Sequence, residues 1–154
     1  MIDLPFQYVG NGPEAYAEHG PPAYKTEQAA GFDLRAAITE PINVRPVVFG
    51  GGPVSIPLGI AFAVPVGYEL QLRARSGLAS KWGITLTNGV GTIDADYRGE
   101  LAALISVLGP KNYPVRPGQR ICQAVLAPVS PGAISEHESL PESERGTGGF
   151  GHTG

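Results

Sequence analysis

The chain has 154 residues and a formal net charge of −3 at pH 7. This length is that of one domain with a sizeable core, and the acidic balance argues against nucleic acid or an anionic membrane surface as a partner. The single cysteine, Cys122, excludes an internal disulfide and a zinc site built on cysteines. Because it lies in an apolar segment, 121–125, we expect it to be a buried hydrophobic residue rather than a nucleophile.

The start of the chain lacks the features of a targeting segment. Residues 1–5 contain neither the basic region nor the apolar region of a signal peptide. The longest apolar run, 60–64, ends at Pro65 and is too short to cross a bilayer. We therefore expect a cytoplasmic protein that does not enter the membrane.

Short strands are the predicted building blocks. The 22 glycines and 15 prolines divide the chain into short segments. Apolar and polar residues alternate in 68–75 and 84–87, whereas 101–108 and 121–129 are apolar on both faces. Turn residues separate these segments, and 10–22 and 130–144 are read as connections rich in Pro, Gly and Glu. The pattern predicts an all-β fold, a barrel or jelly roll.

The segment 30–36 is the first that could carry chemistry. Asp33 and Arg35 are two residues apart in a predicted strand, so they share one face. Charged residues are unusual inside a strand. The segment by itself is also compatible with an ordinary exposed ion pair.

A strand-to-helix junction at 73–83 is a candidate anion site. Ser76 can cap the N-terminus of one short helix, and Gly83 can end it. Free N–H groups at such an N-terminus attract anions, and Arg75 and Ser76 would reinforce the attraction at Gly77. The same three residue types also occur in ordinary turns.

The segment 88–100 contains an Asn-Gly turn dipeptide followed by acidic and aromatic residues. Asp94 and Tyr97 are three residues apart, so they would face opposite sides of a regular strand. The backbone must therefore bend if both are to reach one ligand, and the turn at Asn88 fits a hairpin that bends it. A solvated acidic turn is the alternative.

Two further segments complete the candidates. Gln123 lies in a strand that is apolar on both faces, and a buried amide needs hydrogen-bond partners. The partner is either a neighbouring loop or a ligand, which would be a phosphate or a metal-bound water. The last ten residues, 145–154, include five glycines, together with Arg145 and Phe150. Such a tail is either frayed or, as we expect, a lid that orders over a nucleotide.

Five of these segments together resemble the five ordered motifs of the homotrimeric dUTPases. They are Ala-Gly-Phe-Asp-Leu-Arg (30–35), Arg-Ser-Gly-Leu-Ala (75–79), Gly-Thr-Ile-Asp-Ala-Asp-Tyr-Arg-Gly-Glu (91–100), Gly-Gln-Arg-Ile-Cys-Gln (118–123) and Arg-Gly-Thr-Gly-Gly-Phe-Gly-His-Thr-Gly (145–154). Each motif is weak alone, but all five in order are very specific. The resemblance covers residues 30–154 and leaves the N-terminal lead unaligned.

The resemblance implies a fold and an assembly. The fold would be a distorted β jelly roll with one short helix, in a β domain with an arm (1–144) followed by the glycine-rich lid (145–154). Three chains would associate around a threefold axis with exchanged C-terminal arms. Each of the three active sites would then combine residues of several chains.

The resemblance also implies a reaction, the hydrolysis of dUTP to dUMP and pyrophosphate with Mg²⁺. Asp94 would be the general base and Arg145 would neutralise the phosphates. Asp33 would act on the magnesium through waters. The residues that would hold the substrate come from the last four motifs and from the Asn-Gly turn, and they are Arg75, Ser76, Gly77, Asn88, Tyr97, Gln123, Phe150 and Thr153. Tyr97 would lie under the deoxyribose, and Phe150 would stack on the uracil. Arg35, Asp96 and Arg120 also match the motifs, and their role would be mainly structural. His152 stands at a position of the tail that varies in the family and would have no catalytic role.

Two alternatives have different expected features. A dCTP deaminase-like trimer shares the core but uses a glutamate in its pocket and has no glycine-rich lid. A non-catalytic nucleotide-binding or structural trimer would not require Asp94, Tyr97 and Arg145 to occur together. A P-loop NTPase is excluded, because no Gly-Lys-Ser/Thr sequence follows a strand.

Overall fold

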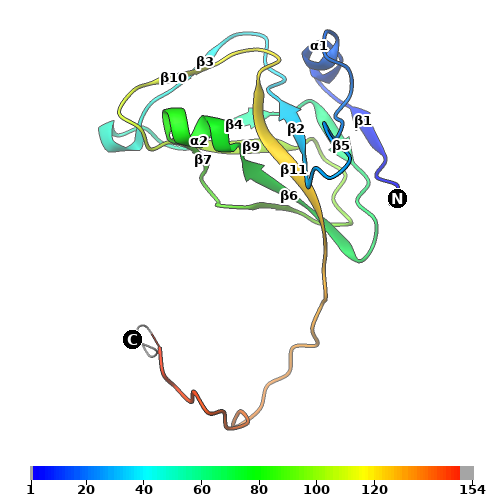
Figure 1. Ribbon diagram of the computed structural model, residues 1–154, viewed down its shortest axis with the longest axis vertical. Helices are drawn as coiled ribbons and strands as arrows, with labels where there is room; N and C mark the ends of the chain where they lie inside the picture. The colour runs from blue at the N-terminus through cyan, green and yellow to red at the C-terminus, as the bar shows by residue number, and fades with distance from the viewer. Residues whose placement is uncertain (1, 150–154) are drawn as a thin grey trace.

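The computed structural model describes residues 2–149, which form a β-rich body with an extended C-terminal segment (Figure 1). The strands are β1 (Phe6–Tyr8), β2 (Phe32–Arg35), β3 (Ile42–Val44), β4 (Val54–Pro57), β5 (Ile60–Phe62), β6 (Tyr68–Ala74), β7 (Ile84–Leu86), β8 (Gly91–Ile93), β9 (Ala102–Val107), β10 (Tyr113–Val115) and β11 (Arg120–Pro128). The helices are α1 (Gly12–Tyr16) and α2 (Ser76–Trp82), with a 3₁₀ turn η1 (Val47–Phe49).

The strands form four antiparallel sheets. The largest has the order β2-β11-β6-β8, and a second has the order β4-β9-β7. Two pairs, β1-β5 and β10-β3, complete the body. Most neighbours in these sheets are distant in the sequence, as in a jelly roll, and the predicted all-β fold is confirmed.

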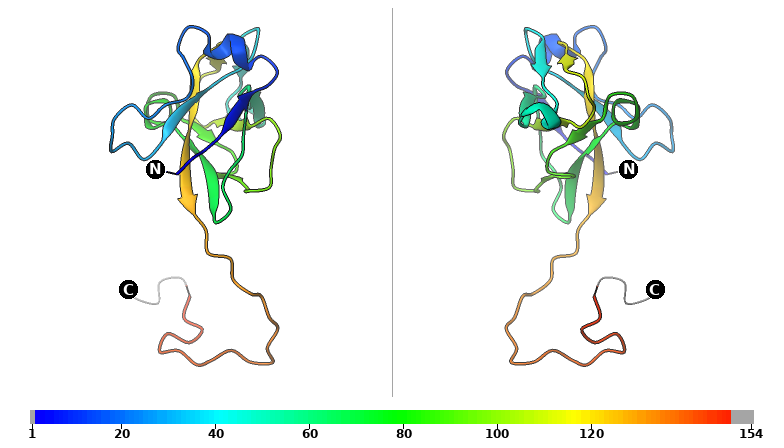
Figure 2. Two further views of the ribbon diagram at one scale, coloured as in Figure 1. Left: turned by 90° about the vertical axis from the view of Figure 1, so that its right-hand side faces the viewer. Right: turned by 90° about the vertical axis from the view of Figure 1, so that its left-hand side faces the viewer.

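The core consists of the inward faces of these strands. In β6 the alternation works as predicted, because Leu70 and Leu72 are buried while Gln71 and Arg73 point outward. In β11, Ile121 and Cys122 are both buried although they are neighbours in the sequence. The two longest strands, β6 and β11, are paired along seven residues and run through the centre of the body (Figure 2).

A second short helix occupies part of the segment that the sequence analysis reads only as a connection. Pro13 stands in the first turn of α1, where its missing N–H removes no hydrogen bond. A side chain at Gly12 would overlap the carbonyl oxygen of Gly59, so glycine permits the close approach of the helix to the body. Tyr16 is buried, and its hydroxyl accepts a hydrogen bond of 3.0 Å from the backbone N–H of Arg35. Tertiary contacts therefore produce this helix.

The C-terminal segment leaves the body at the end of β11 and makes an extended excursion (Figures 1 and 2). Two apolar residues in it, Ile134 and Leu140, are 103% and 83% exposed. Residues 130–144 lack helix and strand, as the sequence predicts. We call residues 129–144 the arm. Within residues 2–149, no helix is both long enough and apolar enough to span a membrane.

Cys122 is expected to be chemically inert in the native protein. Burial raises the pKa of its thiol to about 12, so almost no reactive thiolate exists at pH 8. Iodoacetamide should therefore leave the native protein unmodified over hours, while protein unfolded in guanidinium should be alkylated within minutes. Mass spectrometry measures both. Comparable rates in the two states would show that the strand opens readily.

Candidate active site

The register of the largest sheet brings three predicted segments together. Asp33 in β2 is directly opposite Gln123 in β11, and Gln123 is opposite Arg73 in β6. Residues opposite one another in an antiparallel sheet point to the same face. The end of β6 then leads through Arg75 into α2. Segments 30–36, 73–79 and 118–123 therefore meet at one end of the sheet.

Asp33 is the centre of an ion-pair cluster. Its Oδ1 accepts a hydrogen bond of 2.8 Å from Arg75 Nε, and its Oδ2 accepts one of 2.9 Å from Arg120 Nη1. Arg75 Nη1 also donates to the carbonyl oxygen of Arg120, at 3.1 Å. Each guanidinium retains further N–H groups, and the side chains of Arg75 and Arg120 are 23% and 46% exposed. The carboxylate therefore orients two cations that solvent or a ligand can reach.

A β-bulge makes this arrangement possible. The register between β11 and β2 shifts between Arg120, opposite Arg35, and Cys122, opposite Leu34. The extra residue places Arg120 on the same face as Gln123, although the two are an odd number of positions (three) apart. The resemblance implies a mainly structural role for Arg120, and nothing in the sequence of 118–123 indicates a bulge.

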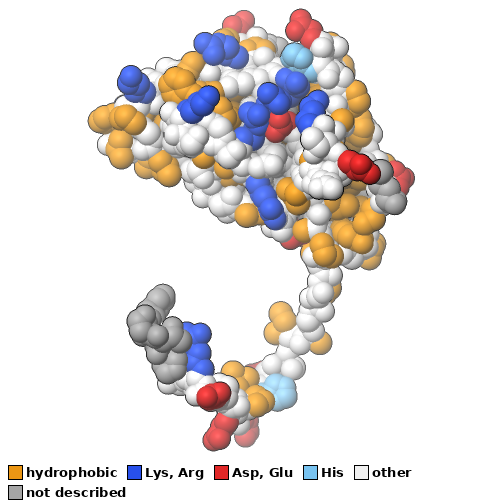
Figure 3. Space-filling view, in the orientation of Figure 1, with side chains coloured by type: hydrophobic (Ala, Val, Ile, Leu, Met, Phe, Trp, Pro, Cys, Tyr) orange, Lys and Arg blue, Asp and Glu red, His pale blue; other side chains and the backbone are white. Residues whose placement is uncertain are grey.

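The resulting face is electropositive in an acidic protein. Four arginines surround Asp33. Arg75 and Arg120 form ion pairs with it, Arg35 is two residues along the same strand, and Arg73 is opposite Gln123 in the next strand but one. Lys and Arg side chains gather on this side of the body in Figure 3. Desolvation lowers the pKa of Arg35, and the neighbouring positive charge of Arg120 lowers it further. Such a face suits a polyphosphate.

Gln123 finds its partner within the sheet. Its Nε2 donates a 3.0 Å hydrogen bond to the carbonyl oxygen of Ala74 in β6. The side-chain amide therefore lies beside the last residue before Arg75. Its side-chain oxygen accepts no hydrogen bond from residues 2–149 and can still accept one from a ligand or water.

The helix prediction needs one correction. Arg75, not Ser76, is the N-cap residue of α2, and no side chain caps the helix. The first helical hydrogen bonds are those from Leu78 and Ala79 to the carbonyl oxygen of Arg75. Ser76 and Gly77 precede those donors and are exposed. Gly83 ends the helix in the left-handed conformation, with φ of 67°, as predicted.

The segment after β7 contains a turn but not the predicted hairpin. Gly89 has φ of 72° and donates its N–H to the carbonyl oxygen of Leu86, so the Asn-Gly turn forms. However, β7 pairs with β9 and β8 pairs with β6, so the strands on either side of the turn are not partners. Asn88 is exposed at this crossing between the two sheets. The hairpin prediction fails because each strand finds a longer partner elsewhere.

The predicted bend between Asp94 and Tyr97 is present. The N–H of Tyr97 donates to the carbonyl oxygen of Asp94 at 3.2 Å, which closes a turn directly after β8. Both side chains border a cavity of about 280 Å³, whose lining also includes Thr92, Ile93, Glu100, Leu101 and Ala102. The Asp94 carboxylate is exposed. It makes no hydrogen bond or ion pair with the other described residues.

Within residues 2–149, one chain does not bring all the predicted site residues together. Ile93 is opposite Leu70 in the register of β6 and β8, so Asp94 lies beside Glu69. Arg75 directly follows the other end of β6, six residues further along the chain than Glu69, which corresponds to about 20 Å of extended backbone. The cavity beside Asp94 and the cluster around Asp33 are therefore at opposite ends of β6.

Of the predicted site residues in the lid, the structure describes only Arg145. Arg145 is exposed beyond the arm, and its Nε donates a 2.8 Å hydrogen bond to the carbonyl oxygen of Gly148. The other two predicted contacts, Phe150 and Thr153, lie outside the described residues, as does His152. The division of the chain at residue 145 stays a prediction.

A protein cage for a metal ion is absent from residues 2–149, because no three His, Cys, Asp or Glu side chains gather there. Asp33 is the predicted metal-side residue, and each of its oxygens already accepts one hydrogen bond from an arginine. A carboxylate oxygen has a second lone pair, so Asp33 can still accept from a metal-bound water. The donor set thus fits an ion that is carried mainly by a triphosphate.

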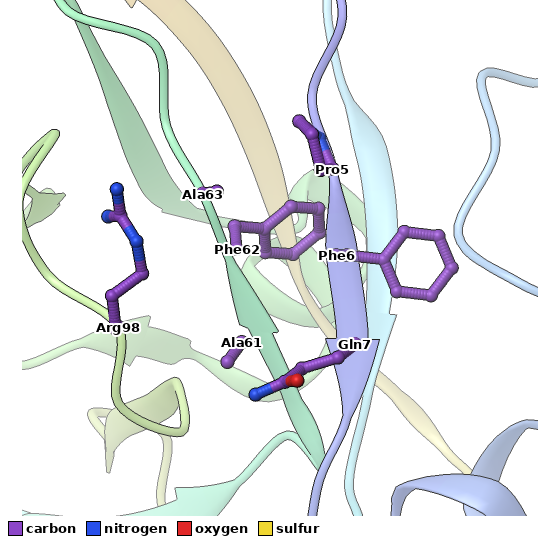
Figure 4. Close-up of a pocket in the computed structure, with 7 residues that line it drawn as sticks. All are labelled: Pro5, Phe6, Gln7, Ala61, Phe62, Ala63 and Arg98. Carbon is purple, nitrogen blue, oxygen red and sulfur yellow. The ribbon is translucent and has the colours of Figure 1, made fainter.

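A separate cavity of about 230 Å³ lies beside the N-terminal strand (Figure 4). The aromatic ring of Phe62 and the side chains of Pro5 and Gln7 line it, and Arg98 approaches from the turn that contains Tyr97. Arg98 Nη1 donates to the carbonyl oxygens of Ala95 and Tyr97, at 2.7 and 2.8 Å. This arginine therefore supports the turn from outside the cavity that Asp94 borders.

The comparisons with known proteins agree with this picture. The dUTPase family model matches residues 18–154. A protein of Chlamydia pneumoniae named deoxyuridine 5'-triphosphate nucleotidohydrolase is 51% identical over 134 residues, which are 86% of this chain and 90% of that protein. A protein of the same name from Syntrophotalea carbinolica is 50% identical over 133 residues, 86% of this chain and 88% of that protein.

Solved structures show the same fold. The dUTPase of Staphylococcus bacteriophage 80alpha, bound to dUPNHPP, superposes with a TM-score of 0.82 at 24% identity, and the match covers 100% of this chain and 99% of that one. A variant dUTPase of phage phi11, described with a structural Mg(II) ion, has a TM-score of 0.73 at 20% identity over 90% of this chain and 99% of that one. With half the residues identical in curated relatives and a family model that spans most of the sequence, this chain belongs to the dUTPase family.

Proposed function

We propose that the protein hydrolyses dUTP to dUMP and pyrophosphate. The observation that carries the proposal is the cluster in which Asp33 holds Arg75 and Arg120 beside Gln123. It provides oriented cations and an amide where a triphosphate can bind. The names of the relatives support uracil as the base and deoxyribose as the sugar.

Three kinds of group are needed for the reaction, and the chain offers each. Asp94 is exposed beside the cavity and accepts a proton from the attacking water, whose oxygen then bonds to the α-phosphorus. The bond between the α-phosphorus and the bridging oxygen breaks, and pyrophosphate leaves. Arg75 and Arg145 neutralise the phosphate charge, and Ser76, Gly77 and Gln123 donate hydrogen bonds to it. Asn88 reads the base, and Phe150 and Thr153 close over the substrate.

Magnesium is part of the proposal. Bound to the triphosphate, Mg²⁺ would neutralise charge and orient the phosphates for in-line attack. Asp33 would contact it only through water, because both carboxylate oxygens are engaged by arginines. The neighbouring guanidinium groups also disfavour direct contact between Asp33 and a second cation.

The site is proposed to be composite, in a homotrimer with exchanged arms. The separation along β6 supports this, because Asp94 and Arg75 of one chain are too far apart to act on one α-phosphorus. The exposed apolar residues of the arm, Ile134 and Leu140, support it too, since they lack partners among the described residues of their own chain. A cytoplasmic location stays a prediction of the sequence.

The direct test is an incubation of the purified protein with each dNTP and Mg²⁺, with the products separated by chromatography. Formation of dUMP and pyrophosphate from dUTP alone is the expected result. Formation of dUTP from dCTP would instead indicate a deaminase. The absence of turnover with every nucleotide would leave a binding module.

Tyr97→Ala is expected to relax the selection of deoxyribose. The ring borders the cavity beside Asp94 and is proposed to exclude a 2'-hydroxyl by steric overlap. The ratio of kcat/KM for dUTP to that for UTP should therefore fall by about 10-fold or more. A ratio equal to that of the parent enzyme would place sugar selection elsewhere.

A further inference from the structure

The ring of Tyr97 lies directly over Gly99. A Cβ atom built on Gly99 would overlap the phenolic oxygen of Tyr97 and would lie 2.6 Å from its Cζ and 3.1 Å from its Cε2. Real Cβ atoms essentially never come within 3.0 Å of another group. The position of this ring therefore depends on the absence of a side chain two residues later.

Glycine is not required at position 99 for its backbone freedom. Gly99 is not among the glycines of the chain that have positive φ. A residue with a side chain could adopt its backbone conformation without strain. Among the described residues, the space occupied by Tyr97 is thus what favours glycine here.

The phenol docks on a fixed part of the backbone. Tyr97 Oη donates a 3.0 Å hydrogen bond to the carbonyl oxygen of Glu100. Glu100 is itself anchored, because its Oε1 accepts a 2.9 Å hydrogen bond from the N–H of Gly59 on another strand connection. The ring is otherwise 44% exposed, so this docking and the contact with Gly99 define its position.

We propose that Gly99 is a positioning residue for sugar selection. Its missing side chain lets the phenolic end of Tyr97 lie against the turn, with the hydroxyl on Glu100, and this position sets the wall of the cavity beside Asp94. The inference rests on the proposed function, in which that wall excludes a 2'-hydroxyl. It adds that the wall's position is set from residue 99 rather than by Tyr97 alone.

The test is Gly99→Ala, a change of one methyl group. The methyl displaces a half-exposed ring rather than the core, so the fold should persist and Tm should change by only a few degrees. The ratio of kcat/KM for dUTP to that for UTP should fall by about 10-fold. A crystal structure of the variant should show the Tyr97 ring moved away from Glu100.

Gly52→Ala is the matched control. Gly52 also lacks positive φ, and a Cβ there would meet nothing within 4 Å. It lies in the loop before β4, outside the proposed site. The control should keep the selectivity and the stability of the parent enzyme.

The double variant Gly99→Ala/Tyr97→Ala separates a direct effect from a structural one. If Gly99 acts through Tyr97, the double variant has the same ratio as Tyr97→Ala alone. It also lacks the overlap, so it serves as the second variant if Gly99→Ala folds poorly. Additive losses of selectivity would overturn the inference.

The remaining outcomes distinguish this inference from the proposed function. If Tyr97→Ala relaxes selectivity and Gly99→Ala does not, the inference about Gly99 is wrong and the role of Tyr97 stands. If neither variant changes the ratio, the inference about Gly99 and the proposed role of Tyr97 in sugar selection are both wrong. An unmoved Tyr97 ring in the crystal structure of Gly99→Ala would also overturn the inference.

Discussion

Replacement of Asp94 by asparagine is expected to lower the turnover of dUTP by about 10²–10⁴-fold while the protein still binds the nucleotide. An amide keeps the size of the carboxylate but cannot accept the proton of the attacking water. The fold should not change, because the exposed Asp94 side chain makes no hydrogen bond or ion pair with the rest of residues 2–149. The loss should therefore appear in kcat.

Two measurements check this expectation. Single-turnover kinetics reports the chemical step, and calorimetric titration with a non-hydrolysable dUTP analogue reports binding. Asp3→Asn is the matched control, since it removes an exposed carboxylate from the N-terminal segment and should leave both quantities unchanged. Turnover of Asp94→Asn within a few fold of the parent enzyme would show that another group is the base.

Mixed trimers are expected to recover activity that neither parent chain has. One parent carries Asp94→Asn, and the other ends at Glu144 and so lacks Arg145 and the rest of the tail. Each alone should be nearly inactive, with losses of about 10²-fold or more. In a composite site, an intact Asp94 from one chain can meet an intact tail from another.

The expected amount follows from random assembly. When the two chains are unfolded together in equal amounts and refolded, about one quarter of the sites combine an intact base with an intact tail from a different chain. The activity of the mixture should therefore approach about one quarter of that of the parent enzyme. Native mass spectrometry confirms that mixed trimers form. If they form and the activity equals only the sum of the two parents, each tail serves the site of its own chain.

Local patterns determined much of what the sequence could predict. The alternation in β6, the two-faced apolar run in β11 and the glycine that ends α2 are all properties of neighbouring residues, and the structure contains all three. Each of these three features depends on the chain's own spacing rather than on distant contacts. The bend between Asp94 and Tyr97 was expected on a different ground, namely that both residues reach one ligand, and it comes from a turn after β8 rather than from a hairpin at Asn88.

Long-range contacts determined what the sequence could not predict. The bulge that aligns Arg120 with Asp33 is a feature of the pairing between β11 and β2, which are far apart in the sequence. Helix α1 depends on Tyr16 reaching the backbone of Arg35, and the missing hairpin reflects the choice of β9 as the partner of β7. Propensity carries no information on such pairings.

The seven residues of β6 fix the distance between the Asp94 end and the Arg75 end of the strand within each chain. Because side chains alternate, an insertion of one residue between Leu70 and Leu72 would turn one of them out of the core unless a bulge absorbed it, as one does in β11. Without a bulge, the strand can change length only in steps of two residues, or about 7 Å. The spacing between the carboxylate end and the arginine end of this strand therefore cannot drift gradually as the sequence diverges. Small adjustments to the substrate must come from the loops at the two ends of the strand or from the angle at which chains meet.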